Sequence, residues 1–265
     1  MTGALFWGIA WSRFTFLERF QAHTFAPLWI SFIVFLNALT VHRTGQSLLT
    51  HKTRFLVILF PLSAAFWWFF EYLNRFVQNW YYVGVKFGAL EYFLYATISF
   101  STVLPAVASM HALLISYSGY HRYYQTWIKI NIKSPKRLSW SVILCAGLGL
   151  TCIGLLPDFL FPVLWISPLL IVVSLQTILK EDHILSDLVQ GDWIKVISYP
   201  LAALVCGFFW EMWNYYSLAK WQYSIPFVHR FQVFEMPILG YAGYLPFGLE
   251  CALVAMTVQG WMTQK

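Results

Sequence analysis

The chain has 265 residues, of which 59% are apolar and only 11% are charged. Soluble domains average about 45–50% apolar and about 25% charged residues, so this chain has too little charge to cover a water-exposed surface. We therefore predict an all-α integral membrane protein with no separate soluble domain. The net charge of +6 comes from basic residues in the loops between apolar runs, so we attribute it to membrane topology rather than to nucleic acid binding.

Residues 1–25 form an aromatic N-terminal segment with Arg13, Glu18 and Arg19 on its polar side. This pattern predicts an interfacial helix that lies at the membrane surface. The first residues lack both a basic stretch and a small-residue cleavage site, so we do not interpret them as a signal peptide.

Residues 26–262 are predicted to form a single membrane domain of about seven helices. A helix needs about 20 apolar residues to cross a bilayer, and seven apolar runs approach or reach that length. The fourth and fifth runs are separated only by Pro157 and Asp158, which predicts a tight hairpin. The predicted spans are 26–42, 54–73, 89–115, 139–156, 159–178, 195–216 and 234–259.

The charges of the loops predict the orientation of these spans. Loops 43–54 and 116–138 are rich in Lys and Arg, which favours their cytoplasmic side. Loop 179–194 is on the same side but is acidic, which is a mild departure from the rule that cytoplasmic loops are rich in Lys and Arg. The N-terminus is then outside and the C-terminus inside, and we expect a multi-pass protein of a prokaryotic cytoplasmic membrane.

The most informative feature is an internal repeat, with copies at about 54–115 and 195–259. Each copy contains E-x-x-N, then W-x-Y, then a second Glu that opens an apolar run. The two copies start four spans apart, so they have the same orientation, which predicts a parallel repeat about an axis along the membrane normal. The matched residues are Glu71, Asn74, Trp80, Tyr82 and Glu91 in the first copy, and Glu211, Asn214, Trp221, Tyr223 and Glu235 in the second.

The repeated acids indicate a site. A carboxyl at membrane depth costs about 2.5–3.5 kcal/mol on insertion scales, so a sequence keeps one where it has a partner or a use. Each Asn follows its Glu by three residues and shares its helix face, where it can orient the carboxyl. A protonated carboxyl in an apolar pocket is a proton donor. The alternative is a structural hydrogen bond between helices. Glu250, in the last span, has no counterpart in the first copy.

Aromatic residues are concentrated around these acids. Windows 66–82 and 208–223 contain 18 of the 53 aromatic residues of the chain. Belts at the membrane interface explain part of this enrichment. Four tryptophans lie beside the glutamates, where ring faces can stabilise a cation: Trp67, Trp68, Trp210 and Trp213.

Metal and cofactor chemistry has no support in the sequence. The four cysteines lie in apolar runs without a CxxC pair, and the histidines show no HxxH or HxxxH spacing. Phosphate-binding loops, dinucleotide-binding motifs and Asp-rich clusters are also missing. We therefore expect neither a metal nor a cofactor.

At the residues of the repeat, the chain resembles the lycopene cyclase-like membrane proteins, which include carotenoid cyclases and fungal meroterpenoid cyclases. The resemblance rests on W-W-F-F-E (67–71), W-Y-Y (80–82) and L-E-Y-F (90–93), and on F-W-E (209–211), W-Q-Y (221–223) and F-E-M-P (234–237). Carotenoid cyclases usually have a paired P-x-E-E before the second span of the unit, whereas this chain has single glutamates. The resemblance implies a cofactor-free, proton-initiated cyclisation of an isoprenoid chain.

We therefore expect an isoprenoid cyclase or isomerase whose partners are a lipid-soluble substrate and membrane lipids. In this hypothesis Glu71 or Glu211 donates the proton, and Glu235 or Glu91 removes one. The aromatic residues named above, with Trp80, Tyr82, Trp221 and Tyr223, would bind the substrate. A non-enzymatic lipid- or pigment-binding protein, a subunit of a membrane complex and a proton-coupled transporter are the alternatives. The acids gather near one face, whereas a transporter needs a polar path to both faces.

Overall fold

The computed structural model describes residues 1–263 and consists mainly of helices. Helices account for 72% of the structure and the strands are short, which confirms the predicted all-α class. Within the described range, five segments are long and apolar enough to cross a membrane. They are α3 (Phe25–Thr44), α5 (Thr53–Val77), α6 (Ala89–Phe100) with α7 (Val103–Ile115), α12 (Ile194–Tyr215), and η3 (Ile238–Gly243) with α13 (Tyr244–Thr263).

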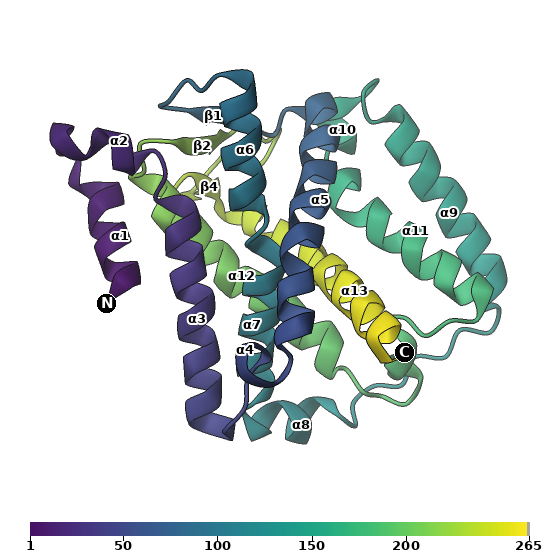
Figure 1. Cartoon of the computed structure of the whole chain (residues 1–265). Coiled ribbons are helices and arrows are strands. Elements are labelled where there is room, and N and C mark those ends of the chain that lie inside the picture. Colours follow the sequence, from purple (N-terminus) through teal and green to yellow (C-terminus); the bar gives the residue numbers. More distant parts are fainter. Residues whose placement is uncertain (264–265) are drawn as a thin grey trace.

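The predicted fourth and fifth spans form a separate helical pair at one side of the bundle (Figure 1). They are α9 (Pro135–Cys152) and α11 (Val163–Leu179), and the short helix α10 (Pro157–Leu160) connects them. This connection is longer than the predicted turn, because α10 begins at Pro157 and Pro162 precedes α11. Proline has no N–H to continue a preceding helix, so each of these prolines starts a new helix.

The N-terminal segment is broken rather than a single helix. It contains α1 (Thr2–Ser12), η1 (Thr15–Leu17) and α2 (Glu18–Gln21), and the first break is at Arg13, which has a φ of 55°. Helix α1 lies alongside α3 (Figure 1). Its Trp7 and Trp11 pack edge to face with ring centroids 5.4 Å apart, and Trp7 also contacts Trp213 of α12. Apolar packing against the bundle thus fixes the position of this segment.

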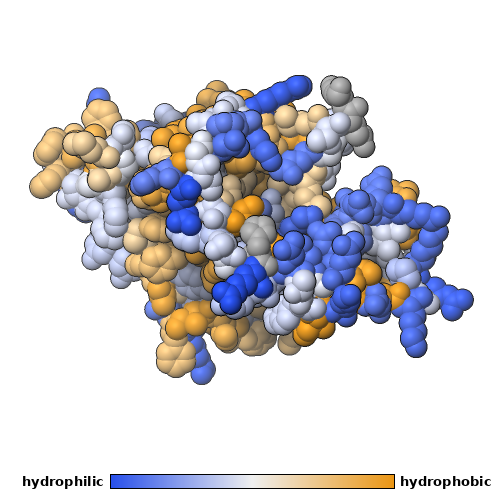
Figure 2. All heavy atoms as spheres, turned by 90° about the horizontal axis from the view of Figure 1, so that it is seen from below, coloured by the Kyte–Doolittle hydropathy of each residue, from blue (hydrophilic) through white to orange (hydrophobic). Residues whose placement is uncertain are grey.

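The connecting segments with the basic loops gather at one end of the bundle. The loops 43–54, 116–138 and 179–194, which contain α4 (Leu48–His51), α8 (Ser118–Tyr124) and η2 (Ser186–Val189), all lie at the lower end in Figure 1. Figure 2 shows this end face-on, with many hydrophilic residues across it. The strands lie at the opposite end (Figure 1). The basic loops and the strands therefore lie at opposite ends of the bundle.

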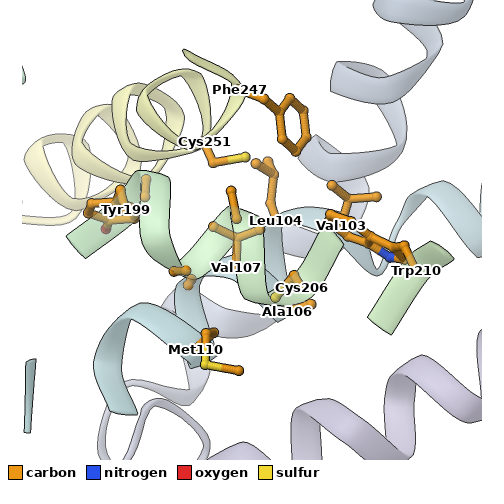
Figure 3. Packing of buried hydrophobic residues seen from close by; sticks show 14 of the residues in the cluster. Val103, Leu104, Ala106, Val107, Met110, Tyr199, Cys206, Trp210, Phe247 and Cys251 are labelled. Atoms are coloured by element: carbon orange, nitrogen blue, oxygen red, sulfur yellow. The ribbon is translucent and has the colours of Figure 1, made fainter. Parts of the chain in front are cut away.

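Small residues let the central helices approach closely. A Cβ on Gly248 of α13 would lie only 2.5 Å from the carbonyl oxygen of Tyr199 in α12. Side chains of α7, α12 and α13 meet at this crossing, among them Cys206, Cys251 and Leu104 (Figure 3). Such small-residue contacts are typical of helix packing in membranes.

A serine bridges the break between α6 and α7. The hydroxyl of Ser63, which is fully buried in α5, donates to the carbonyl of Phe100 at 2.5 Å and accepts from the N–H of Leu104 at 3.0 Å. It thereby satisfies main-chain groups that the interrupted helix leaves unpaired. The predicted third span is thus two helices held by α5.

A two-stranded antiparallel sheet joins segments from the two halves of the chain. In it, β1 (Trp80–Val83) pairs with β2 (Lys220–Tyr223), so that Trp80 faces Tyr223 and Tyr82 faces Trp221. Each strand therefore places its Trp opposite the Tyr of the other. A smaller ladder joins β3 (Gln232–Val233) to β4 (Met236–Pro237).

Candidate functional site

A cavity of about 550 Å³ lies at the strand end of the bundle. This volume is within the range of about 300–1,000 Å³ that small-molecule sites occupy. The lining includes residues of β1, β2, α5, α6, α11, α12 and α13, and most of these residues are aromatic or aliphatic. A hydrophobic molecule of moderate size fits such a chamber.

Glu71 is held at one wall of the cavity by three donors. Its Oε1 accepts from the indole of Trp67 at 3.1 Å, the indole of Trp80 at 2.9 Å and the hydroxyl of Tyr82 at 2.6 Å. All three donors line the cavity, whereas the carboxyl lies just behind them. The Tyr82 hydroxyl therefore connects the Glu71 carboxyl to the cavity wall.

Glu211 occupies the corresponding place at the other wall. Its Oε1 accepts from the hydroxyls of Tyr223 at 2.7 Å and Tyr244 at 2.8 Å, and both phenols line the cavity. The side chain is fully buried, and Oε2 has no hydrogen-bond partner. Burial, together with the neighbouring Glu211 carboxyl, raises the pKa of Tyr223 well above its usual value, so this phenol stays neutral at physiological pH.

The two asparagines hold the strands instead of the carboxyls. The amide of Asn74 donates to the carbonyl of Trp80 at 2.8 Å and accepts from the N–H of Asn79 at 2.8 Å. Asn214 makes the same kind of contacts with the carbonyl and the N–H of Trp221, at 2.8 and 2.9 Å. Both therefore position the W-x-Y strands, and through them the Trp and Tyr side chains that contact the glutamates.

The second glutamate of each copy lies apart from the cavity lining. Glu91 is exposed at the start of α6, where it accepts from the N–H of Gly88 at 3.4 Å. Glu235 is half-buried and forms a 2.5 Å ion pair with Lys220 of β2. The structure thus brings Glu71 and Glu211 to the cavity through their phenols and keeps Glu91 and Glu235 out of its wall.

Six of the eight predicted aromatic residues line the cavity: Trp67, Trp80, Tyr82, Trp210, Trp221 and Tyr223. The remaining two point elsewhere. Trp68 donates to the hydroxyl of Thr97 at 3.0 Å, and Trp213 packs against Trp29 and Phe32 of α3. These two tryptophans belong to helix packing rather than to the wall.

Aromatic residues outside the repeat motifs also line the wall, among them Trp165, Tyr244 and Phe247. Trp165 of α11 and Phe247 of α13 meet edge to face at 6.0 Å, and Tyr244 donates to Glu211. Tyr244 reaches that carboxyl because position 207 is a glycine, since a Cβ there would lie 2.5 Å from the tyrosine ring. In the sequence these residues are ordinary members of apolar spans. The one sequence feature that bears on their placement is the glycine at position 207, which leaves room for the ring of Tyr244.

Glu250 is 4% exposed, lies one helical turn beyond Phe247 and has no partner on either carboxyl oxygen. Across the described residues, no three His, Cys, Asp or Glu side chains gather in a way that could hold a metal ion.

Comparisons with protein-family models, with curated proteins and with solved structures found no match for this chain.

Proposed function

We propose that this protein is an integral-membrane isoprenoid cyclase or isomerase that works by protonation, without a cofactor. One observation carries the proposal. Two glutamates, each bonded to cavity-lining phenols, flank a single aromatic chamber of about 550 Å³. The resemblance of the repeat residues to lycopene cyclase-like proteins supports the same reaction class.

The proposal includes a parallel internal repeat. The β1–β2 register supports it, because a twofold axis between Tyr81 and Gln222 exchanges Trp80 with Trp221 and Tyr82 with Tyr223. Each Asn also binds the Trp main chain in its own half. The two walls of the cavity would then descend from one ancestral unit.

Seven membrane spans with the N-terminus outside complete the proposed topology. The shared position of the basic loops at one end supports it (Figure 1). Reporter fusions after residues 48 and 127 should give a cytoplasmic signal, and an external signal would place the cavity on the opposite side of the membrane.

The proposed reaction begins at Glu211. A proton on this carboxyl passes to the phenol oxygen of Tyr223 or Tyr244, while the proton of that phenol adds to a carbon–carbon double bond of the substrate. The resulting cation closes a ring and then loses a proton to Tyr82, which gives its own proton to Glu71. Product and substrate are isomers, and proton exchange with water resets the two carboxyls between turnovers.

The aromatic wall suits the cationic intermediate. Ring faces stabilise a cation by roughly 0.5–1 kcal/mol at exposed sites and by about 2 kcal/mol or more where water is excluded. Trp67, Trp80 and Trp165 lie near one another, with ring centroids 6.3 Å apart for Trp67 and Trp80 and 5.7 Å apart for Trp80 and Trp165. An alkyl cation in the chamber would therefore be in contact with several ring faces.

Deuterium uptake tests this function directly. Purified protein in lipid is incubated in D₂O with linear isoprenoids of increasing chain length, and the products are analysed by chromatography and mass spectrometry. A cyclic isomer with one solvent-derived deuterium is expected. Glu211→Gln and Glu71→Gln should each lower turnover by about 10²–10⁴-fold, since general acid–base catalysis contributes that much.

Glu181→Gln, in an exposed loop, serves as the matched control and should keep full turnover. Unchanged turnover in both site variants would refute the proposed acid and base. Binding of an isoprenoid with no cyclic product in any preparation would favour the non-enzymatic binding protein instead.

A further inference from the structure

One cavity-lining side chain has unused hydrogen-bonding groups. Asn79, directly before β1, lines the cavity and is 2% exposed. Neither its side-chain oxygen nor its side-chain nitrogen has a hydrogen-bond partner. A buried amide without partners costs free energy, so such a group in a cavity wall points to a polar group on the ligand.

The position of this amide is fixed by its main chain. The N–H of Asn79 donates to Asn74 Oδ1 at 2.8 Å, and its carbonyl accepts from the N–H of Ser224 at 2.8 Å. The residue is therefore held from both sides, by α5 and by the segment after β2. These two hydrogen bonds hold the side-chain amide in place at the cavity wall.

The corresponding residue of the other strand finds its hydrogen-bond partners within the protein. Lys220 precedes Trp221 as Asn79 precedes Trp80, and it also lines the cavity. Its ammonium group bonds Glu235 at 2.5 Å and the carbonyl of Tyr215 at 3.2 Å. The amide of Asn79 has no such partner, so the two walls of the cavity differ in this respect.

A second group on the cavity wall has the same property. The indole N–H of Trp210, in α12, is buried without a partner, and Trp210 lines the cavity. An indole N–H can only donate, so its partner must be an acceptor. An amide offers both a donor and an acceptor, and a hydroxyl group is the simplest partner that can satisfy both.

We propose that the cavity binds a hydroxylated isoprenoid, with the ligand hydroxyl hydrogen-bonded to the amide of Asn79 and the indole of Trp210 as a further donor to ligand oxygen. The proposal rests on the proposed function for the isoprenoid class and goes beyond it in excluding pure hydrocarbons as the preferred ligand. A hydrocarbon would leave both polar groups unpaired. Sites built to bond a hydroxyl discriminate strongly against analogues that lack it.

Equilibrium binding to the full-length protein in lipid nanodiscs tests this. The probes are tritiated geranylgeraniol, its methyl ether and the hydrocarbon with the same carbon skeleton but no oxygen. We expect the alcohol to bind most tightly, the ether less tightly and the hydrocarbon least, with about a tenfold or larger difference in Kd between the first and the last.

Two variants and one control locate the effect. Asn79→Leu keeps a similar volume without polar atoms, and it should reduce the preference for the alcohol to about threefold or less. Trp210→Phe removes the N–H and should reduce the preference partly. Trp213→Phe is the matched control, since its indole N–H is also buried without a partner but lies outside the cavity lining, and it should leave the preference unchanged.

Equal binding of alcohol and hydrocarbon by the unmodified protein would overturn the proposal, as would a preference that survives in both site variants. If Asn79→Leu fails to fold, the ligand series and Trp210→Phe still decide the question. The outcome is separable from that of the cyclase proposal. Equal binding with deuterium uptake would refute only the hydroxyl site, whereas selective binding without any cyclic product would refute only the enzyme.

Discussion

Gly207→Ala should disturb the site through a single clash. Position 207 lies under the ring of Tyr244, and an added Cβ would be 2.5 Å from Cε2 and 2.6 Å from Cδ2 and Cζ. Carbon atoms normally approach to about 3.5–4.0 Å, so the ring must move by about 1 Å. Its hydroxyl now donates to Glu211 at 2.8 Å, and a movement of that size away from the carboxyl would break the hydrogen bond.

The cost has two parts. Overpacking a well-filled core costs about 1–3 kcal/mol, and a lost hydrogen bond costs about 0.5–1.5 kcal/mol. We therefore expect Gly207→Ala to lower the free energy of unfolding by about 2–4 kcal/mol and to reduce turnover, because Glu211 loses one of its two donors.

A matched glycine should behave in the opposite way. Gly147 lies within α9 and has no atom within 4 Å of an added Cβ. Gly147→Ala should be neutral or should stabilise by up to about 1 kcal/mol, since alanine favours the helix. Free energies of unfolding from denaturing-detergent titrations compare the two variants.

A second substitution tests whether the tyrosine ring is the cause. Combining Gly207→Ala with Tyr244→Ala removes the ring that the new methyl group strikes, so the double variant should lose less stability than the two single losses added together. Equal stability of Gly207→Ala and Gly147→Ala, or strictly additive losses, would refute the close contact between α12 and α13 at this point.

Three further predictions concern contacts between the two halves of the chain and contacts within each half. A Tyr81→Cys, Gln222→Cys pair occupies facing positions of β1 and β2, so it should form a disulfide on oxidation, detected by a mobility shift that a reductant reverses; a Tyr81→Cys, Ser217→Cys pair should not. Ser63→Ala leaves main-chain groups of Phe100 and Leu104 unpaired, so we expect a loss of about 1–3 kcal/mol in unfolding titrations, and no loss would contradict the bridge. Because the pKa of Tyr223 is raised by burial and by Glu211, its neutral form stabilises the fold fully below pH of about 10 and loses this effect as the pH rises further. The thermal stability of Tyr223→Phe should therefore fall less steeply above that pH than that of the unmodified protein, and parallel curves would argue against a buried Tyr223.

Several features of the structure could be read from the local sequence. The apolar runs predict where helices form, and the helices α3, α5, α7, α12 and α13 lie within or close to the expected spans. The repeated Trp and Tyr positions led to four residues of the cavity wall, and the tryptophans beside the glutamates led to two more. Both kinds of inference work because composition and short-range spacing determine which segments prefer a membrane and which residues share a helix face.

Other features depended on contacts between distant segments. Spacing alone suggested that Asn74 orients Glu71, whereas the amide binds the main chain of the following strand. Glu91 and Glu235 looked equivalent to the first pair of acids, yet one caps a helix and the other pairs with Lys220. In both cases the partner of the side chain is set by segments that the fold brings beside it, and sequence spacing does not contain this information.

The sequence by itself determined that this chain is mainly helical, with several segments apolar enough to cross a membrane and with two sets of acids and aromatic residues. The tertiary structure alone decided which of these groups meet. Tyr244 reaches Glu211 only because Gly207 of a neighbouring helix leaves room for its ring, and the main-chain hydrogen bonds of Asn79 to Asn74 and Ser224 hold its unpartnered amide in the cavity wall. Such contacts depend on the rotation and the close approach of packed helices, which arise from the whole set of side chains rather than from any one segment.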